Sequence, residues 1–276
     1  MKELLDYTIK HICLYHSIVI GNIFGVKVII KDFGNKNNKK IILLHGGGLS
    51  WWSWGPIIDI LQKKYNVITP IIDGHAEDGE NTFISIDDTT NKLITYIDEN
   101  FNGQIFLLCG LSIGAQIALN ILSKRNDICK YSVIESALVK PIKFLKSLLL
   151  PMARFSYPLI KQKWYSRLQA KTLFVPTDKM DIYYADSCKM SKQSLSNIIL
   201  SNGSFKLNSE ISNTKAQVLI LVGEKEIKIM KQSAIEIHKL IKNSQLEIIA
   251  DCGHGEISLL RPKEYCRYLY DLIDHK

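Results

Sequence analysis

The feature that most restricts the fold of this chain is a serine between two glycines, at the junction of a predicted strand and a predicted helix. Residues 110–114 read GLSIG, with Ser112 at the centre. Residues 104–109 are mostly apolar and typical of a buried strand, and residues 115–122 carry apolar side chains at helical spacing. At such a turn the chain passes very close to itself and the serine is strained. The pattern predicts a nucleophilic serine presented at the end of a strand, beside a helix N-terminus.

Attack by a serine on a carbonyl creates an oxyanion, which backbone N–H groups can stabilise. Residues 40–44 are predicted to form a buried strand that leads directly into the glycine run 45–48, HGGG. Consecutive glycines let N–H groups face a ligand without interference from side chains. The run has neither the ending of a Walker loop nor the spacing of a dinucleotide fingerprint. We therefore expect the amides of Gly47 and Ile113 to form an oxyanion hole.

The predicted general base is His254, which lies between two glycines after the predicted strand 245–250. A histidine on such a loop can reach a serine on a neighbouring loop. His45 and His75 also follow predicted strands, and we interpret them as residues that position loops. The remaining histidines lack this context; they are His11, His16, His238 and His275.

An acid is needed to orient the base, and three glutamates compete for this role. A predicted buried strand ends at Gly223, and Glu226 lies three residues beyond it, far enough to turn back toward His254. Glu224 lies in the same loop, and Glu135 follows another predicted strand. Glu226 is favoured, and the other two remain alternatives.

Together these motifs resemble the α/β-hydrolase superfamily, in which the serine precedes the acid and the acid precedes the histidine. The resemblance begins near residue 17 and implies a mostly parallel central sheet with helices on both faces. It also implies a Ser112-Glu226-His254 triad that cleaves a small carboxylic ester through an acyl-enzyme. Two departures are visible. The acid is more often Asp, and the loop 73–78 reads DGHAED where the superfamily usually has Gly-His-Gly and a small polar residue.

The pattern of apolar residues changes between the two halves of this core. Helical apolar stretches replace strand patterns there, and the resemblance implies a helical cap at 137–210, between core segments 1–136 and 211–276. A cap excludes water and supplies an apolar pocket, to which Gly46 and Trp51 are expected to contribute. The segment is interrupted by Pro141, Pro151, Pro158 and Pro176.

Composition restricts the partners. The 276 residues are 46% hydrophobic and 22% charged, as is usual for a soluble globular chain. The net charge is +8, but the lysines are spread along the chain rather than clustered with aromatic residues. We therefore expect a small-molecule substrate with an apolar acyl group, without nucleic acid, cofactor or metal. The oligomeric state stays open.

Cysteine usage and the N-terminus predict a cytoplasmic protein without stable membrane insertion. The start of the chain lacks the basic region of a signal peptide, and the apolar stretch 12–24 is too short to span a bilayer. Residues 16–20 and 26–30 are expected to be the first two strands, joined by a turn at 21–22, after a short amphipathic helix. No C-x-x-C pair occurs among the six cysteines, which are Cys13, Cys109, Cys129, Cys188, Cys252 and Cys266.

The same motifs serve several chemistries, because function belongs to the site and not to the fold. A carbon–carbon bond hydrolase, a thioesterase, a lactonase and an acyltransferase are alternatives on this fold. A non-catalytic relative that binds a ligand is the alternative of another class. A membrane-associated lipase would require an exposed apolar patch on the cap, which a sequence alone does not reveal.

Overall fold

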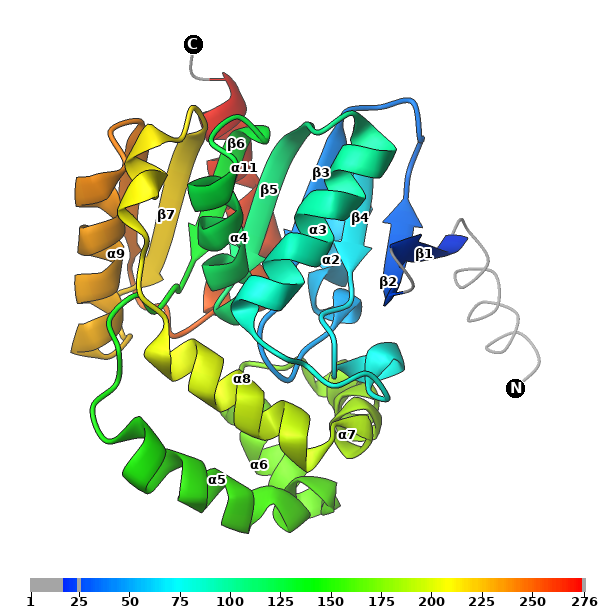
Figure 1. Ribbon diagram of the computed structural model, residues 1–276, viewed down its shortest axis with the longest axis vertical. Coiled ribbons are helices and arrows are strands. Elements are labelled where there is room, and N and C mark those ends of the chain that lie inside the picture. Colours follow the sequence, from blue (N-terminus) through cyan, green and yellow to red (C-terminus); the bar gives the residue numbers. More distant parts are fainter. Residues whose placement is uncertain (1–16, 24–25, 275–276) are drawn as a thin grey trace.

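The core of the molecule is an eight-stranded β-sheet with the order β1-β2-β4-β3-β5-β6-β7-β8 (Figure 1). The computed structural model describes residues 17–23 and 26–274. Strands β3 to β8 are parallel, whereas β2 pairs antiparallel with β1 and β4. The mostly parallel sheet expected from the sequence is confirmed. The strands are β1 (Ser17–Ile23), β2 (Val26–Phe33), β3 (Lys40–Leu44), β4 (Asn66–Pro70), β5 (Ile105–Leu111), β6 (Cys129–Glu135), β7 (Gln217–Gly223) and β8 (Ser244–Ile249).

Helices cover both faces of the sheet, with α3, α4 and α9 on one face and α2 and α11 on the other (Figure 1). Parallel strands covered in this way are apolar on both sides. In β3, Ile42 and Leu44 pack with buried residues of α3 and α4, and Ile41 and Leu43 pack with those of α2 and α11. The helices and turns of the core are η1 (Trp51–Trp54), α2 (Gly55–Leu61), η2 (Ala76–Asp78), α3 (Ile86–Phe101), α4 (Ile113–Lys124), α9 (Lys228–Leu240), α10 (Glu256–Leu260) and α11 (Pro262–Asp274).

A second group of helices comes between β6 and β7 in the sequence. In space it crosses the carboxyl end of the sheet (Figure 1). Side chains tie this group to the core. The indole N–H of Trp52 donates to Asp186 Oδ2 (2.9 Å), and the Phe83 N–H donates to Ser194 Oγ (3.2 Å). We call the group the inserted helices: η3 (Leu145–Leu149), α5 (Leu150–Ser156), η4 (Tyr157–Lys161), α6 (Lys163–Thr172), η5 (Thr177–Lys179), α7 (Met180–Lys189), α8 (Lys192–Ser204) and η6 (Ser209–Asn213).

Two expectations about the first strands are wrong. The predicted turn at residues 21–22 lies inside β1, because the ladder with β2 continues to the pair Ile23–Val26. The polar composition of residues 35–40 also predicts a hairpin loop before β3, but this loop does not join neighbouring strands. β4 lies between β2 and β3, so β3 has parallel partners on both sides.

Some of the predictions concern residues outside the described part of the chain. These are the helix expected in the first dozen residues, Cys13, and the histidines at positions 11, 16 and 275. Within the described part, no helix combines the length and the apolarity needed to cross a membrane. The cysteines described there are all free thiols: Cys109, Cys129, Cys188, Cys252 and Cys266.

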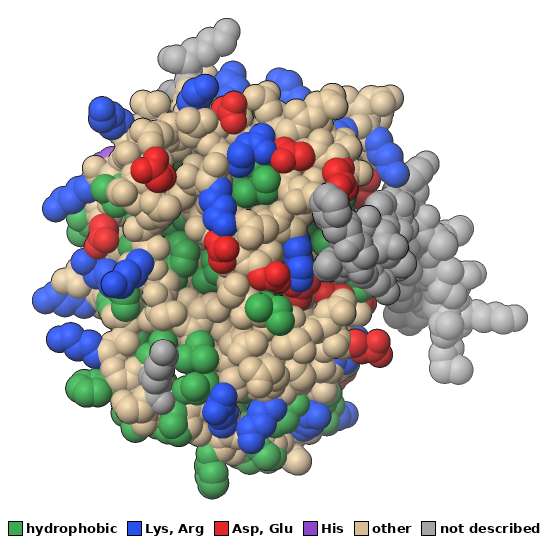
Figure 2. Space-filling model, viewed as in Figure 1, with side chains coloured by type: hydrophobic (Ala, Val, Ile, Leu, Met, Phe, Trp, Pro, Cys, Tyr) green, Lys and Arg blue, Asp and Glu red, His purple; other side chains and the backbone are tan. Residues whose placement is uncertain are grey.

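Charged side chains are mixed in sign over the core. Figure 2 shows Lys and Arg interspersed with Asp and Glu on the part of this face that covers the sheet and its helices. Several of them form ion pairs, such as Lys124 with Asp87 (2.5 Å) and Arg125 with Asp98 (2.7 Å). The absence of nucleic acid from the partners stays a prediction.

Candidate active site

The turn between β5 and α4 places Ser112 in a strained backbone conformation. Its φ of 55° and ψ of −114° lie outside the regions that a serine ordinarily occupies. The neighbouring glycines are needed for the close approach. A Cβ on Gly110 would lie 2.4 Å from the carbonyl oxygen of Gly114, and one on Gly114 would lie 2.3 Å from that of Leu44. The elbow therefore has the geometry that its sequence predicts.

Three predicted site residues form one chain of hydrogen bonds. His254 Nε2 lies 3.0 Å from Ser112 Oγ, and His254 Nδ1 lies 2.8 Å from Glu226 Oε2. Ser112 follows β5, Glu226 follows β7 and His254 follows β8. These strands are parallel, so their carboxyl ends lie on the same side of the molecule. With Nδ1–H donating to the carboxylate, Nε2 is free to accept the serine proton. The Glu226 side chain is 1% exposed and that of His254 is 39% exposed, so the histidine is open to a substrate.

The carboxylate of Glu226 is held from its other side as well. Its Oε1 accepts hydrogen bonds from the Gly223 N–H (2.9 Å) and from Ser136 Oγ (2.7 Å). Burial by itself raises the pKa of Glu226, but the hydrogen bond and charge of His254, with these two donors, lower it overall. Ser136 is a site residue that the sequence reasoning missed. Ser136 directly follows β6, at the carboxyl end of the sheet, and this position is the signal that could have identified it as a site residue.

The two competing glutamates lie elsewhere. Glu224 Oε2 accepts a hydrogen bond from the Asp251 N–H (3.1 Å), and its side chain is exposed. Glu135 is buried at the end of β6, where its Oε1 accepts from the Ser258 N–H (3.4 Å). Burial raises the pKa of Glu135 to about 7. Of the three candidates, Glu226 is the one that the structure brings against His254.

The predicted oxyanion residues lie side by side. A Cβ on Gly47 would be 3.7 Å from Ile113 Cγ2. Ile113 begins α4, so its N–H has no acceptor within the helix and lies at the positive end of the helix dipole. The two N–H groups together have the chemistry of an anion site next to Ser112.

His45 holds the glycine run in place, as interpreted from its position after a strand. It is fully buried; its Nε2 accepts from the Ile72 N–H (3.1 Å), and its Nδ1 lies 2.9 Å from the Gly46 carbonyl oxygen. Burial, and the neighbouring ring of His75, lower the pKa of His45 to about 3. A neutral imidazole that bridges the ends of β3 and β4 fixes the loop on which Gly47 lies.

An apolar pocket of about 340 Å³ opens above Ser112 and His254. The inserted helices supply most of its wall, and Gly47 and Gly48 supply the part nearest the serine. No lysine or arginine is among the described residues that line it. The other lining residues are Ile160, Gln169, Leu173, Tyr183, Ser187, Met190, Leu195, Ile198 and Asn202.

The two residues expected in the pocket wall differ in their positions. Gly46 lines a small hollow of about 20 Å³ that also contains Ser112 and His254. Trp51 is not among the described residues that line either hollow. The turn η1 directs its ring toward β2, where it lies 5.8 Å from the ring of Phe33 and donates to Glu77. Trp51 therefore packs against β2 and its neighbours rather than lining the pocket.

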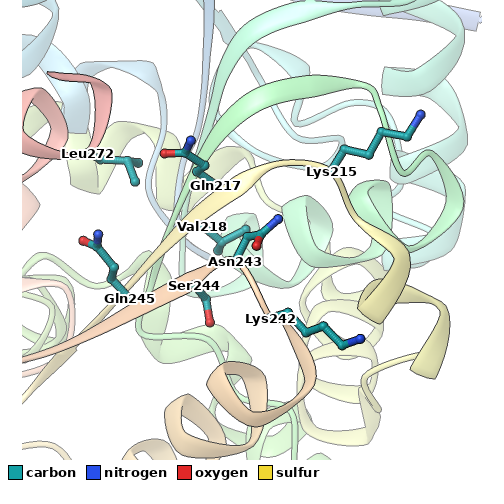
Figure 3. Close-up of a pocket in the computed structure, with 8 residues that line it drawn as sticks. All are labelled: Lys215, Gln217, Val218, Lys242, Asn243, Ser244, Gln245 and Leu272. Carbon is teal, nitrogen blue, oxygen red and sulfur yellow. The ribbon is translucent and has the colours of Figure 1, made fainter. Parts of the chain in front are cut away.

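Another hollow, of about 390 Å³, lies at the opposite end of the sheet, where β7 and β8 begin. It is lined mainly by polar residues, among them Lys215 and Lys242. Figure 3 shows that these two lysine side chains extend away from the other lining residues and do not converge on one point. The hollow contains none of the predicted site residues.

Comparisons with known proteins agree with the fold. The sequence profile of the alpha/beta hydrolase family matches residues 41–268. The chain is 22% identical to the bovine (Bos taurus) protein named monoacylglycerol lipase ABHD6, over 84% of this chain and 74% of that protein. An AB hydrolase superfamily protein of Gibberella zeae is 28% identical over 103 residues, 37% of this chain and only 36% of that protein. The solved structure of carboxylesterase CesB from Bacillus subtilis superposes with a TM-score of 0.77 at 16% identity, covering 98% of this chain and 96% of that one.

Proposed function

Since this chain belongs to the alpha/beta hydrolase family, we propose that it is a serine carboxylesterase with Ser112, His254 and Glu226 as its catalytic triad. The observation that carries the proposal is the pair of hydrogen bonds, 3.0 Å and 2.8 Å long, that joins these residues. A buried carboxylate, an imidazole and a strained serine in this order are the parts that nucleophilic acyl transfer requires.

The proposed reaction begins when Ser112 Oγ attacks the ester carbonyl carbon and His254 Nε2 takes the hydroxyl proton. The carbonyl oxygen becomes an oxyanion that the N–H groups of Gly47 and Ile113 stabilise. Each such donor typically changes the rate by about 10²–10³. The C–O bond to the alcohol then breaks, and His254 gives its proton to the leaving oxygen. Water, deprotonated by His254, hydrolyses the acyl-enzyme, and Glu226 stabilises the imidazolium in both halves of the reaction.

We further propose that residues 137–210 act as a cap that excludes water from the acyl-enzyme. The inserted helices support this role because their side chains, such as Ile160, Leu173 and Ile198, form most of the pocket wall. An apolar wall without a cationic group favours an uncharged acyl chain over a substrate that carries a carboxylate. The proposed substrates are therefore carboxylic esters with an apolar acyl group.

A fluorophosphonate probe tests the proposal directly. We expect one covalent adduct, which peptide mass mapping assigns to Ser112, and no adduct on the Ser112→Ala variant. Ser187→Ala serves as the matched control, because Ser187 lines the same pocket without a hydrogen bond to His254. An unlabelled but folded wild type, or equal labelling of Ser112→Ala, would overturn the proposed nucleophile.

A substrate panel tests the reaction class. p-Nitrophenyl esters of increasing acyl length, a thioester and a lactone are compared by kcat/KM. We expect the esters with apolar acyl chains to be the best substrates. A thioester or lactone preferred by more than about tenfold would reassign the chemistry while leaving the triad in place.

A further inference from the structure

The outer side of the inserted helices carries large apolar side chains that face solvent. Phe155 is 89% exposed, Phe144 is 74% exposed and Trp164 is 62% exposed. Four of these residues recur every three or four positions along η3, α5 and η4, so they share one helical face. Phe144 directly precedes η3, and α6 adds a pair four residues apart. We call this set the apolar surface: Phe144, Leu148, Met152, Phe155, Leu159, Trp164 and Leu168.

The apolar surface is not a part of the core left open by chance. The same helical run has a second apolar face, made by Leu145, Leu150 and Ile160, which is buried. Ile160 reaches the pocket above Ser112 from this inner face. The run is thus apolar on both sides, which is unusual for a helix at a protein surface. Clustered apolar residues in solvent mark an interaction site.

Basic residues surround the apolar surface. Between Glu135 and Asp178 the sequence holds eight lysine and arginine residues and no aspartate or glutamate. Figure 2 shows green and blue side chains together at the lower end of the molecule, over the inserted helices, with no red ones among them. On the core, by contrast, both signs of charge are mixed. The exposed basic residues here include Lys143, Lys161, Lys163, Arg167 and Lys171.

We propose that the apolar surface docks on the surface of an anionic lipid membrane. Phe, Trp, Leu and Met side chains enter the boundary between headgroups and acyl chains, while lysine and arginine contact the phosphate groups. This combination fits lipid better than two other occupants. A second copy of the chain would bring two basic surfaces together without an acidic partner, and nucleic acid would leave the apolar side chains unburied.

Docking in this orientation turns the roof of the pocket toward the membrane. The helical run faces lipid with the apolar surface and faces the pocket with Ile160. Esters dissolved in the lipid would then enter the pocket and reach Ser112. This consequence rests on the proposed function. Docking itself does not depend on it.

Vesicle co-sedimentation of the full chain carrying Ser112→Ala measures docking without hydrolysis. Vesicles of phosphatidylcholine alone are compared with vesicles that also contain phosphatidylglycerol. We expect binding to the anionic vesicles, weaker binding to the neutral ones, and loss of binding at high salt because the charges are screened. A chain that stays in solution with anionic vesicles at low salt overturns the proposal, whatever its activity on soluble esters.

Substitutions in the same background locate the contact. Met152→Ser with Phe155→Ser is expected to weaken binding at least tenfold, because two large apolar side chains no longer enter the lipid. Ile235→Ser with Ile248→Ser is the matched control, because both isoleucines are exposed on the core. Equal losses in the two double variants would overturn the assignment to the inserted helices. Circular dichroism checks that each variant is folded.

A charge pair completes the test. Lys161→Glu with Lys163→Glu is expected to weaken binding to anionic vesicles by about tenfold or more, because two cations that contact the lipid phosphate groups become anions. Lys239→Glu with Lys242→Glu makes the same change in net charge on the core, where both lysines are exposed, and is expected to have a smaller effect. Sedimentation velocity without lipid detects self-association. A dimer that Phe155→Ser dissociates would assign the apolar surface to a second copy instead.

Discussion

The carboxyl end of the sheet and the inserted helices above it are built in opposite ways. At the sheet, Glu226 accepts three hydrogen bonds, and His45 and Ser136 fix the neighbouring loops. On the inserted helices, large side chains such as Phe155 face solvent. The first region holds atoms in fixed geometry, as the proposed proton transfer requires, and the second supplies surface and volume. Substitutions in the first should therefore affect turnover, and those in the second should affect which molecules reach the serine.

The largest effect is expected at the proposed nucleophile. Ser112→Ala should lower kcat/KM for a short p-nitrophenyl ester by about 10⁴–10⁶-fold, because no acyl-enzyme can form. The thermal midpoint should hardly change. Residual activity within tenfold of wild type would mean that the serine at the elbow is not the nucleophile.

The three candidate acids can be separated by one conservative change at each. Glu226→Gln keeps the shape but favours the wrong imidazole tautomer, so kcat should fall about 10³–10⁴-fold. Glu224→Gln, on the exposed side of the same loop, is the control and should stay within about twofold. If the two effects were reversed, the 2.8 Å contact between Glu226 and His254 would not be the functional one.

Glu135 should affect stability rather than turnover. Its pKa is raised to about 7 by burial, above its ordinary value of 4.5. The folded state therefore binds the proton more tightly than the unfolded state, and stability falls as pH rises from about 4.5 toward 7. Glu135→Gln should remove this loss, raising the free energy of unfolding by about 1–3 kcal/mol at pH 8 and little at pH 4. Urea titrations at both pH values measure this, with exposed Glu99→Gln as a control that should not change.

Ser136 is expected to act as a positioning residue. Ser136→Ala removes one donor to Glu226 and should lower kcat about tenfold while KM stays nearly constant. The pKa of Glu226 should rise toward its ordinary value, so the acid limb of the pH–rate profile should move upward. Ser136→Cys is the conservative control and should restore part of the activity. An unchanged pH profile would leave Ser136 with a structural role only.

The smallest effect on turnover is expected in the wall of the pocket. Ile160→Ala enlarges the apolar cavity and should change the preference among acyl lengths by about three- to tenfold, with activity on an acetyl ester nearly unchanged. Leu148→Ala, on the solvent side of the same helical run, should leave the preference unchanged. A large loss of kcat on the acetyl ester in Ile160→Ala would contradict the division between the two regions.

Most of the core was predictable because its signals are local. Apolar runs that end in glycine indicated β3, β5 and β7, and the GLSIG turn indicated the strained serine; the α/β-hydrolase fold that they implied is confirmed. Errors arose where strand pairing and side-chain packing override the local pattern. The turn expected at residues 21–22 is part of a ladder, and the ring of Trp51 is directed toward Phe33 by η1. The catalytic roles of the triad residues stay predictions.

The sequence by itself determined the fold class and the positions of Ser112 and His254, because strand pattern, glycine content and chain order are written within short segments. Only the tertiary structure decided which of three glutamates lies against His254, since that depends on how the loops after β7 and β8 meet. It alone decided that Phe155 and its neighbours face solvent. Helical spacing defines a face of a helix, but whether that face is covered depends on what the rest of the chain packs against it.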